Sequence, residues 1–490
     1  MGRAVTRIIG RLVLSLAVLA ITGFVLLVLI GLWDRYEKET AALGFRAIYE
    51  RLAWLSGSSD WKTRTSADGE RAPRPAIDRE RVAAWLVLKL VGTGAIGAAN
   101  QGTSVAVSAD GKTAIVGGPG PNNADRDRSP LAGPVGAAWV FARSGTIWTQ
   151  QGNKLIGTMS ECGGGLWSQG VSVALSADGD TAIVGGPSDN RTTGAAWVFS
   201  RKDGVWAQQG NKLVGTGASG AGDPSSSLGQ GMSVALSADG NTAIVGAWRA
   251  EAAWVFTRSG GVWTQQGNKL VGSGAMGHAG QGISVALSAD GNTALVGGWS
   301  DNNKTGAAWV FIRKGSVWTQ QGKKLVGSGA VGNARQGSSV ALSADGNTAI
   351  VGGPSDNPSD RSAPFGVGAF GAAWVFNRSD GVWTQQGNKL VSNGGVWTEQ
   401  GTSVALSADG NTALMGGFAQ DRSVSAASMF TRSDGQWKQG KTLAGRSTLG
   451  KSAPSIALSA DGGIVLLGEP SENGGMGAAW VLSRTDGGGY

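Results

Sequence analysis

Four tryptophans stand in loops between the predicted strands of a repeated unit, where an indole ring could bind a ligand. They are Trp167, Trp248, Trp299 and Trp397. Such rings stack on sugars or anchor partner proteins, and neighbouring arginines can add polar contacts. The arginines of these loops are Arg126, Arg128, Arg249, Arg335 and Arg361. We call these nine residues the candidate ligand face. The alternative is that the tryptophans only cover the ends of the sheets, and the Gly-x-Trp sequences at Trp167 and Trp397 favour it.

Catalytic chemistry has less support in the same loops. Two carboxylates can cleave a glycosidic bond, but nothing fixes the separation between any two of them here. The loop carboxylates are Asp125, Asp127, Asp189, Asp301, Asp356 and Asp360. His278 is the single histidine, which excludes a multi-histidine metal site, and no Gly-x-Ser-x-Gly sequence accompanies it. The single Cys162 cannot form an internal disulfide. The sequence therefore predicts no catalytic residue and no enzyme activity.

The loops belong to a unit that the chain repeats seven times. Each copy opens on a phrase such as Ser-Val-Ala-Leu-Ser-Ala-Asp-Gly, and the copies begin at Ser104, Ser172, Ser233, Ser284, Ser339, Ser403 and Ser455. In the fourth copy, residues 284–288 form a strand, the following Asp-Gly sequence turns the chain, and three further strands are expected near 293–296, 307–311 and 317–321. Seven four-stranded units predict an all-β, seven-bladed β-propeller.

The position of the loops in such a propeller follows from its connectivity. Connections alternate between the two ends of each blade, so the loops between the second and third strands share one face with the blade-to-blade loops. Their lengths vary most on that face, where binding residues are typically carried. The third-strand tryptophans are instead expected to pack between blades. They are Trp139, Trp197, Trp254, Trp309, Trp374 and Trp480.

The last copy lacks a fourth strand, because the chain ends ten residues after Trp480. Residues 85–90 precede the first copy and echo the Lys-Leu-Val-Gly ending of the other fourth strands. Leu90 precedes Ser104 by fourteen residues, as Leu270 precedes Ser284. We therefore predict that residues 85–90 complete the seventh blade and close the ring, which removes an exposed sheet edge. Trp85 lies two residues nearer to Lys89 than its counterparts do, so the pairing register stays open.

The segment before the propeller has the pattern of a membrane anchor. Residues 12–33 contain no charge, and 22 residues give roughly 33 Å of helix, enough to span a bilayer. Arginines crowd residues 1–11, which places this end in the cytoplasm. The apolar stretch is longer than the ~7–15 residues of a cleaved signal peptide, so we expect an uncleaved signal anchor. Residues 34–81 are expected to form an amphipathic stalk helix and a flexible linker, and residues 82–490 a propeller in the periplasm or outside the cell.

The repeats resemble the FG-GAP repeats of the integrin α-chain propeller and its bacterial relatives. Gln-Gly stands where that family has Phe-Gly, as at Gln281-Gly282, and Gly185-Gly186-Pro187 takes the Gly-Ala-Pro place. The resemblance spans residues 85–490 and implies a seven-bladed recognition surface outside the cytoplasm. Family members often bind calcium in the first hairpin, but most copies here keep one carboxylate where calcium needs six to eight oxygen ligands. No cofactor is therefore expected.

The charge pattern disfavours nucleic acid as a partner. The formal net charge is +8, but the first eleven residues alone contribute three of these charges, and the rest is spread too thinly to form a basic stripe. The sequence thus predicts a membrane-anchored, non-enzymatic binding propeller of the cell envelope, whose partner is a protein or another cell-surface ligand. Two alternatives stay open: a carbohydrate-binding or carbohydrate-hydrolysing propeller, and an envelope scaffold without a dedicated ligand.

Overall fold

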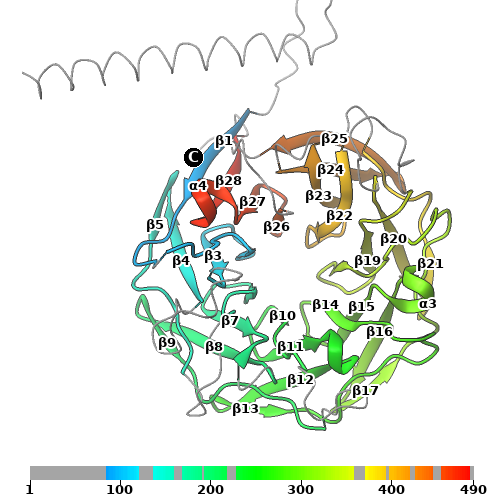
Figure 1. Cartoon of the computed structure of the whole chain (residues 1–490), viewed down its shortest axis with the longest axis horizontal. Helices are drawn as coiled ribbons and strands as arrows, with labels where there is room; N and C mark the ends of the chain where they lie inside the picture. Colours follow the sequence, from blue (N-terminus) through cyan, green and yellow to red (C-terminus); the bar gives the residue numbers. More distant parts are fainter. Residues whose placement is uncertain are drawn as a thin grey trace, which may run out of the picture. The chain divides into compact units, whose positions relative to one another are not determined.

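The computed structural model contains seven four-stranded antiparallel sheets arranged around a central axis (Figure 1). It describes residues 84–485 apart from 96, 121–135, 159–167, 190–192, 218–227, 358–369, 393–396, 420–424 and 445–453. The predicted seven-bladed, all-β propeller is confirmed. Residues 12–33 and 34–81 lie outside the described residues, so the anchor and the stalk stay predictions. In the described part of the chain, no helix is both long and apolar enough to cross a membrane.

The first four blades follow one another in sequence. Blade one contains β2 (Ser104–Val107), β3 (Thr113–Gly118), β4 (Ala137–Ser144) and β5 (Ile147–Gln150). Blade two contains β6 (Ser172–Leu175), β7 (Thr181–Gly186), β8 (Ala195–Lys202) and β9 (Val205–Gln208). Blade three contains β10 (Ser233–Leu236), β11 (Thr242–Ala247), β12 (Ala252–Ser259) and β13 (Val262–Gln265). Blade four contains β14 (Gln281–Leu287), β15 (Thr293–Gly298), β16 (Ala307–Lys314) and β17 (Val317–Gln320).

The remaining blades complete the ring. Blade five contains β18 (Ser339–Leu342), β19 (Thr348–Gly353), β20 (Ala372–Ser379) and β21 (Val382–Gln385). Blade six contains β22 (Trp397–Leu406), β23 (Thr412–Ala419), β24 (Ser425–Ser433) and β25 (Gln436–Ala444). Blade seven combines β26 (Ser455–Leu458), β27 (Ile464–Glu469) and β28 (Ala478–Thr485) with β1 (Ala84–Leu90). Three short helical turns, η1 (Trp248–Ala250), α3 (Asp301–Lys304) and α4 (Glu472–Gly475), lie between second and third strands.

The predicted closure is confirmed, and the structure resolves its register. β1 pairs along its whole length with β28, and Trp85 lies opposite Arg484, as Trp148 lies opposite Arg143 in blade one. In blade one the pairing then shifts by two residues before the bridge between Ala138 and Leu155, whereas β1 pairs without a shift. The absent two-residue bulge explains why Trp85 stands closer to Lys89 than its counterparts do.

A ring of backbone hydrogen bonds joins the first hairpins of all seven blades. In each of these turns the alanine N–H donates to the carbonyl of the matching alanine in the next blade, at 2.8–3.1 Å. The alanines are Ala109, Ala177, Ala238, Ala289, Ala344, Ala408 and Ala460, and the last donates back to the first. Closure therefore does not depend on β1 alone, because hydrogen bonds also link consecutive blades near their inner strands.

The third-strand tryptophans pack as predicted, and five of them lie over a glycine. Trp309 is fully buried, and a Cβ added to Gly272 would lie 2.1 Å from its Cδ1 atom. The same relation pairs Gly92 with Trp139, Gly157 with Trp197, Gly215 with Trp254, and Gly327 with Trp374. Blade six changes both partners: Ser428 replaces the tryptophan, Ser392 replaces the glycine, and their hydroxyls form a buried hydrogen bond of 2.9 Å. The paired change indicates that the indole and the glycine fit each other.

The Gln-Gly sequences have a structural task that an aromatic residue could not perform. The Gln281 side chain is buried; its Oε1 accepts the Gly272 N–H at 2.6 Å and its Nε2 donates to the Gly272 carbonyl at 3.0 Å. Matching glutamines hold the corresponding glycines in four other blades; they are Gln101, Gln169, Gln230 and Gln336. The amide thus fixes the glycine on which the tryptophan packs.

Acid should destabilise the propeller through the carboxylates of the first hairpins. Burial raises the pKa of Asp290 and is the largest contribution, but hydrogen bonds from the Ser288 hydroxyl and the Asn292 N–H and side chain outweigh it and hold the pKa below its ordinary value. The pKa is lowered in the same way at Asp110, Asp239, Asp345, Asp409 and Asp461. A lowered pKa stabilises the fold above the ordinary value, and this stabilisation is lost as the pH falls through the folded-state value.

We therefore expect the melting temperature to fall increasingly steeply below about pH 4. The Asp290→Asn variant should be less stable than the wild type at pH 7 and should lose less stability on acidification. Asp203→Asn is the control, because Asp203 lies in an exposed turn and accepts no side-chain hydrogen bond from the described residues. Thermal unfolding of the three proteins at pH 7, 4 and 3 measures the effect; equal acid sensitivity in all three would contradict it.

Candidate functional site

The structure brings four of the nine predicted ligand-face residues together. Trp248 and Arg249 lie in η1 of blade three, Trp299 directly follows β15, and Arg335 precedes β18. Trp167, Arg126, Arg128 and Arg361 lie outside the described residues. The prediction of a loop position for Trp397 is wrong: Trp397 begins β22 and pairs with Ala419, because β22 and β23 extend further than the matching strands of the other blades.

The two tryptophans and two arginines form a continuous row across adjacent loops. The Trp248 and Trp299 rings meet edge to face, with centroids 6.5 Å apart. The Arg249 guanidinium lies 5.0 Å from the Trp248 ring centroid, and the Arg335 guanidinium lies 5.1 Å from that of Trp299. Both indoles are half-buried and both arginines are exposed. The row therefore offers aromatic edges and guanidinium groups to a ligand.

A carboxylate and an imidazole lie beside this row. The Glu251 side chain accepts the Gly280 N–H at 2.9 Å and the Gln281 N–H at 3.2 Å, which holds it against the loop before β14. His278 belongs to the same loop, and its Nδ1 lies 3.9 Å from the nearer Glu251 oxygen. The His278 side chain is 84% exposed, so solvent or a ligand can reach the imidazole. The pair can orient a group that donates or accepts a proton.

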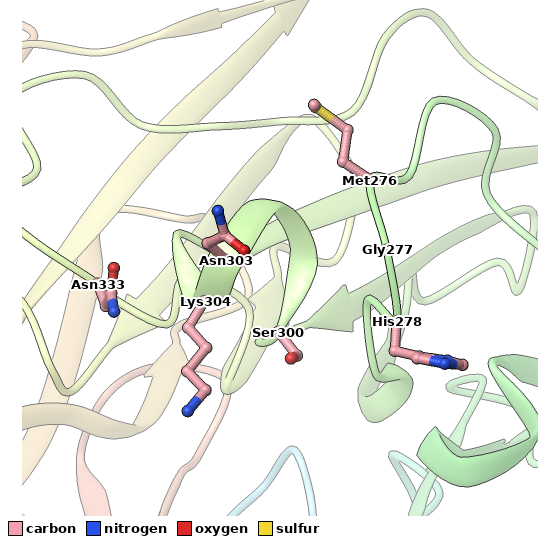
Figure 2. Close-up of a pocket in the computed structure, with 7 residues that line it drawn as sticks. All are labelled: Met276, Gly277, His278, Ser300, Asn303, Lys304 and Asn333. Atoms are coloured by element: carbon pink, nitrogen blue, oxygen red, sulfur yellow. The ribbon is translucent and has the colours of Figure 1, made fainter.

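A pocket of about 360 Å³ opens next to His278 (Figure 2). Its lining comes from the loop before β14, from α3 with the residue before it, and from the loop before β18. The lining residues are Met276, Gly277, His278, Ser300, Asn303, Lys304 and Asn333. In Figure 2, Lys304 and Ser300 point to one side, Met276 to the opposite side, and His278 extends away from Lys304. We call this the blade-four pocket; it offers hydroxyl, amide, imidazole and ammonium groups.

Three buried loop carboxylates are each paired with a lysine, and two of them also hold the loops that form the pocket. One oxygen of the Asp301 carboxylate accepts the Met276 N–H at 2.7 Å, and the other accepts from the Lys324 ammonium at 2.5 Å. Asp356 binds the Val331 N–H and Lys389 in the same way, and Asp189 pairs with Lys212. These three carboxylates were candidates for a hydrolytic pair, but their contacts assign them to loop positioning. Asp125, Asp127 and Asp360 lie outside the described residues.

The first hairpins show how their single carboxylates are used. The carboxylates of these turns accept hydrogen bonds from the preceding serine hydroxyl and from the backbone N–H two residues later, as at Asp290. In the described ranges, no three His, Cys, Asp or Glu side chains are placed to hold a metal ion.

Sequence reasoning missed the residues that line the pocket. His278 was predicted to have no catalytic role, and Ser300, Asn303, Lys304 and Asn333 were not among the predicted site residues. One signal was available: the aligned blade-to-blade loops have Ala98, His278 and Asn333 at the same position. A histidine that appears in one of several near-identical loops is not required by the repeat itself, so it marks the loop that differs in chemistry.

Comparison with known proteins shows similarity of fold. No protein-family model and no curated protein matches the chain. A periplasmic gluconolactonase from Pseudomonas aeruginosa is 18% identical, with a TM-score of 0.48 over 75% of this chain and 98% of its own. A Bacteroides uniformis protein proposed to be a 6-phosphogluconolactonase is 13% identical, with a TM-score of 0.46 over 75% and 95%. A β-propeller domain from Myceliophteria thermophila is 11% identical, with a TM-score of 0.49 over 82% and 100%.

These comparisons correct two predictions. The FG-GAP resemblance is not confirmed, because no protein-family model matches the chain. The prediction of a non-enzymatic binding propeller is corrected as well, since the similar structures include one named a periplasmic gluconolactonase. At these identities the likeness concerns the fold, and the function proposed below is argued from the residues of this chain.

Proposed function

We propose that the protein is a carbohydrate-processing enzyme that binds a sugar in the blade-four pocket. One observation carries the proposal: a pocket is lined by His278, which lies beside the Glu251 carboxylate, and by Ser300, which follows Trp299 of the tryptophan pair. The pocket volume of about 360 Å³ lies in the range of small-molecule sites, about 300–1,000 Å³.

The lining suits a ligand with many hydroxyl groups. Asn303 and Asn333 each offer an amide that can donate and accept, Ser300 offers a hydroxyl, and the apolar Met276 can contact a sugar face. Asn303, Asn333 and Lys304 are all exposed, so a ligand can reach their polar ends. Hydrogen-bond partners of this kind reject analogues that lack the matching hydroxyl.

The described side chains support hydrolysis with one base better than hydrolysis with two carboxylates. The loop carboxylates Asp189, Asp301 and Asp356 are committed to lysines, so a glycosidase pair is not available among them. Hydrolysis of a sugar ester or lactone needs one base that takes a proton from water while the water oxygen attacks the carbonyl carbon. His278, beside the Glu251 carboxylate, supplies such a base.

The His278→Asn variant tests this assignment. Asparagine is the matched replacement, because Asn333 occupies the same position in the next blade-to-blade loop. We expect the kcat for the best of a panel of sugar lactones and sugar esters to fall by about 100-fold or more, with a smaller change in KM. Thermal unfolding should be unchanged, because the side chain is exposed.

Two outcomes would contradict the proposal. The first is a wild-type protein that neither binds nor hydrolyses any sugar of the panel. The second is hydrolysis that His278→Asn leaves unaltered, which would remove the catalytic role of this pocket. Asn333→His serves as the control for the position, since it places an imidazole one blade further without the Glu251 partner.

A further inference from the structure

Two pocket residues hold their side chains in a backbone conformation that disfavours side chains. Asn303 and Lys304 have φ values of 55° and 70°, in the left-handed region, where a Cβ clashes with the backbone. Glycine adopts this region without that clash, so a non-glycine residue there needs a compensating reason. Both residues line the blade-four pocket.

Blade seven contains the same turn built with glycines. Asn302, Asn303 and Lys304 in α3 correspond to Asn473, Gly474 and Gly475 in α4. Asn302 and Asn473 have nearly equal φ values, 48° and 49°. The closing hydrogen bonds also match: Gly306 N–H donates to the Asp301 carbonyl, and Gly477 N–H to that of Glu472, both at 2.9 Å. The fold therefore accepts glycine at these positions, and the side chains of Asn303 and Lys304 are not needed to form the turn.

Lys304 lines the pocket, Arg335 follows the lining residue Asn333 by two positions, and neither has an anionic partner among the described residues. Lys324 is bound to Asp301, and repeat arginines such as Arg201 donate to a carboxylate of their own blade and to amide and hydroxyl groups of the adjoining blade. By contrast, among the described residues neither the Lys304 ammonium nor the Arg335 guanidinium forms an ion pair or a side-chain hydrogen bond. A backbone hydrogen bond from the Arg335 N–H to the Lys304 carbonyl, at 2.8 Å, keeps the two segments adjacent.

We infer that the blade-four pocket selects a sugar that carries an anionic group, a carboxylate or a phosphate, and that Lys304 with Arg335 binds that group while Asn303 binds a hydroxyl. The inference rests on the proposed function. Ammonium and guanidinium groups pair strongly with such anions, and the free hydrogen-bonding groups of both side chains are available for them. The unfavourable backbone conformation is then offset only when the ligand is bound.

The test uses three probes, glucuronate, glucose 6-phosphate and glucose, and measures their Kd for the full chain by calorimetry. We expect at least one acidic sugar to bind about tenfold or more tightly than glucose. Lys304→Gly and Lys304→Gln should remove that preference and leave the Kd of glucose nearly unchanged. Lys304→Gly and Asn303→Gly should also raise the melting temperature by roughly 1–2 °C, because they relieve the left-handed strain. Asn473→Gly in blade seven is the matched control, with a similar thermal gain and no change in Kd.

The outcomes separate the two proposals. If glucose binds as tightly as both acidic sugars, or if both Lys304 variants keep the preference, the inference is overturned while the carbohydrate site remains. If none of the three sugars binds and the lactone and ester panel is also inert, the proposed function fails and the inference with it. If glycine at position 304 lowers the melting temperature, the argument from backbone strain is wrong.

Discussion

Replacing Gly272 by serine is expected to lower the free energy of unfolding by about 3 kcal/mol, at the upper end of the usual overpacking range. The new Cβ would lie 2.1 Å from Cδ1 of Trp309, a ring that is fully buried between blades. Neither group can move freely, because the Gln281 side chain holds both the N–H and the carbonyl of Gly272. Chemical denaturation followed by tryptophan fluorescence measures the loss.

The same substitution should cost far less once the indole is absent. Trp309→Ser alone should lower the free energy of unfolding by about 4 kcal/mol, since it leaves a large cavity. In that background Gly272→Ser should cost under about 1 kcal/mol, because the two serines can form the hydrogen bond that Ser392 and Ser428 form in blade six. Additive losses in the double-mutant cycle would show that the paired change in blade six is unrelated to fit.

Removing β1 should abolish cooperative folding of the propeller. A chain that begins at residue 92 loses the seven pairs between β1 and β28 and leaves the outer edge of blade seven open. It also loses Leu90, which is buried against Val116 and Trp139 of blade one. We expect a loss of about 5 kcal/mol or more, comparable with the whole stability of many domains.

The matched control is a chain that begins at residue 82 and keeps β1. It should melt as the full chain does, and a peptide of residues 82–91 added to the shorter chain should restore part of the transition. A shorter chain that melts at the same temperature as its control would show that the hydrogen-bonded ring of hairpins suffices to close the propeller.

Much of the fold could be predicted because the repeat makes one physical demand many times. A sheet that lies between two others needs apolar residues on both faces, and the alternation around each Asp-Gly turn shows where its strands begin and end. The displaced fourth strand was predictable too, because Leu90 keeps its fourteen-residue spacing to Ser104. The register was not, since it depended on a bulge that β1 lacks.

The site was harder to predict, because it arises where the repeats differ. The left-handed backbone at Asn303 and Lys304 has no signal in a single loop and becomes evident only beside Gly474 and Gly475 in the folded turn. Asp301 was one of six loop carboxylates to which the sequence assigned no task, and it could not show that Lys324 reaches this carboxylate from the next strand connection. The positions of Trp248 and Trp299 between predicted strands placed both in loops, but only the folded structure shows that their rings meet across two blades.

A crystal structure of residues 82–490 with the tightest-binding sugar of the probes tests the central claim most directly. We expect the sugar to lie in the blade-four pocket, with its anionic group at Lys304 and Arg335 and its hydroxyls near Asn303 and His278. Sugar found instead between Lys212 and Trp263, where a second pocket of about 370 Å³ lies, would contradict it.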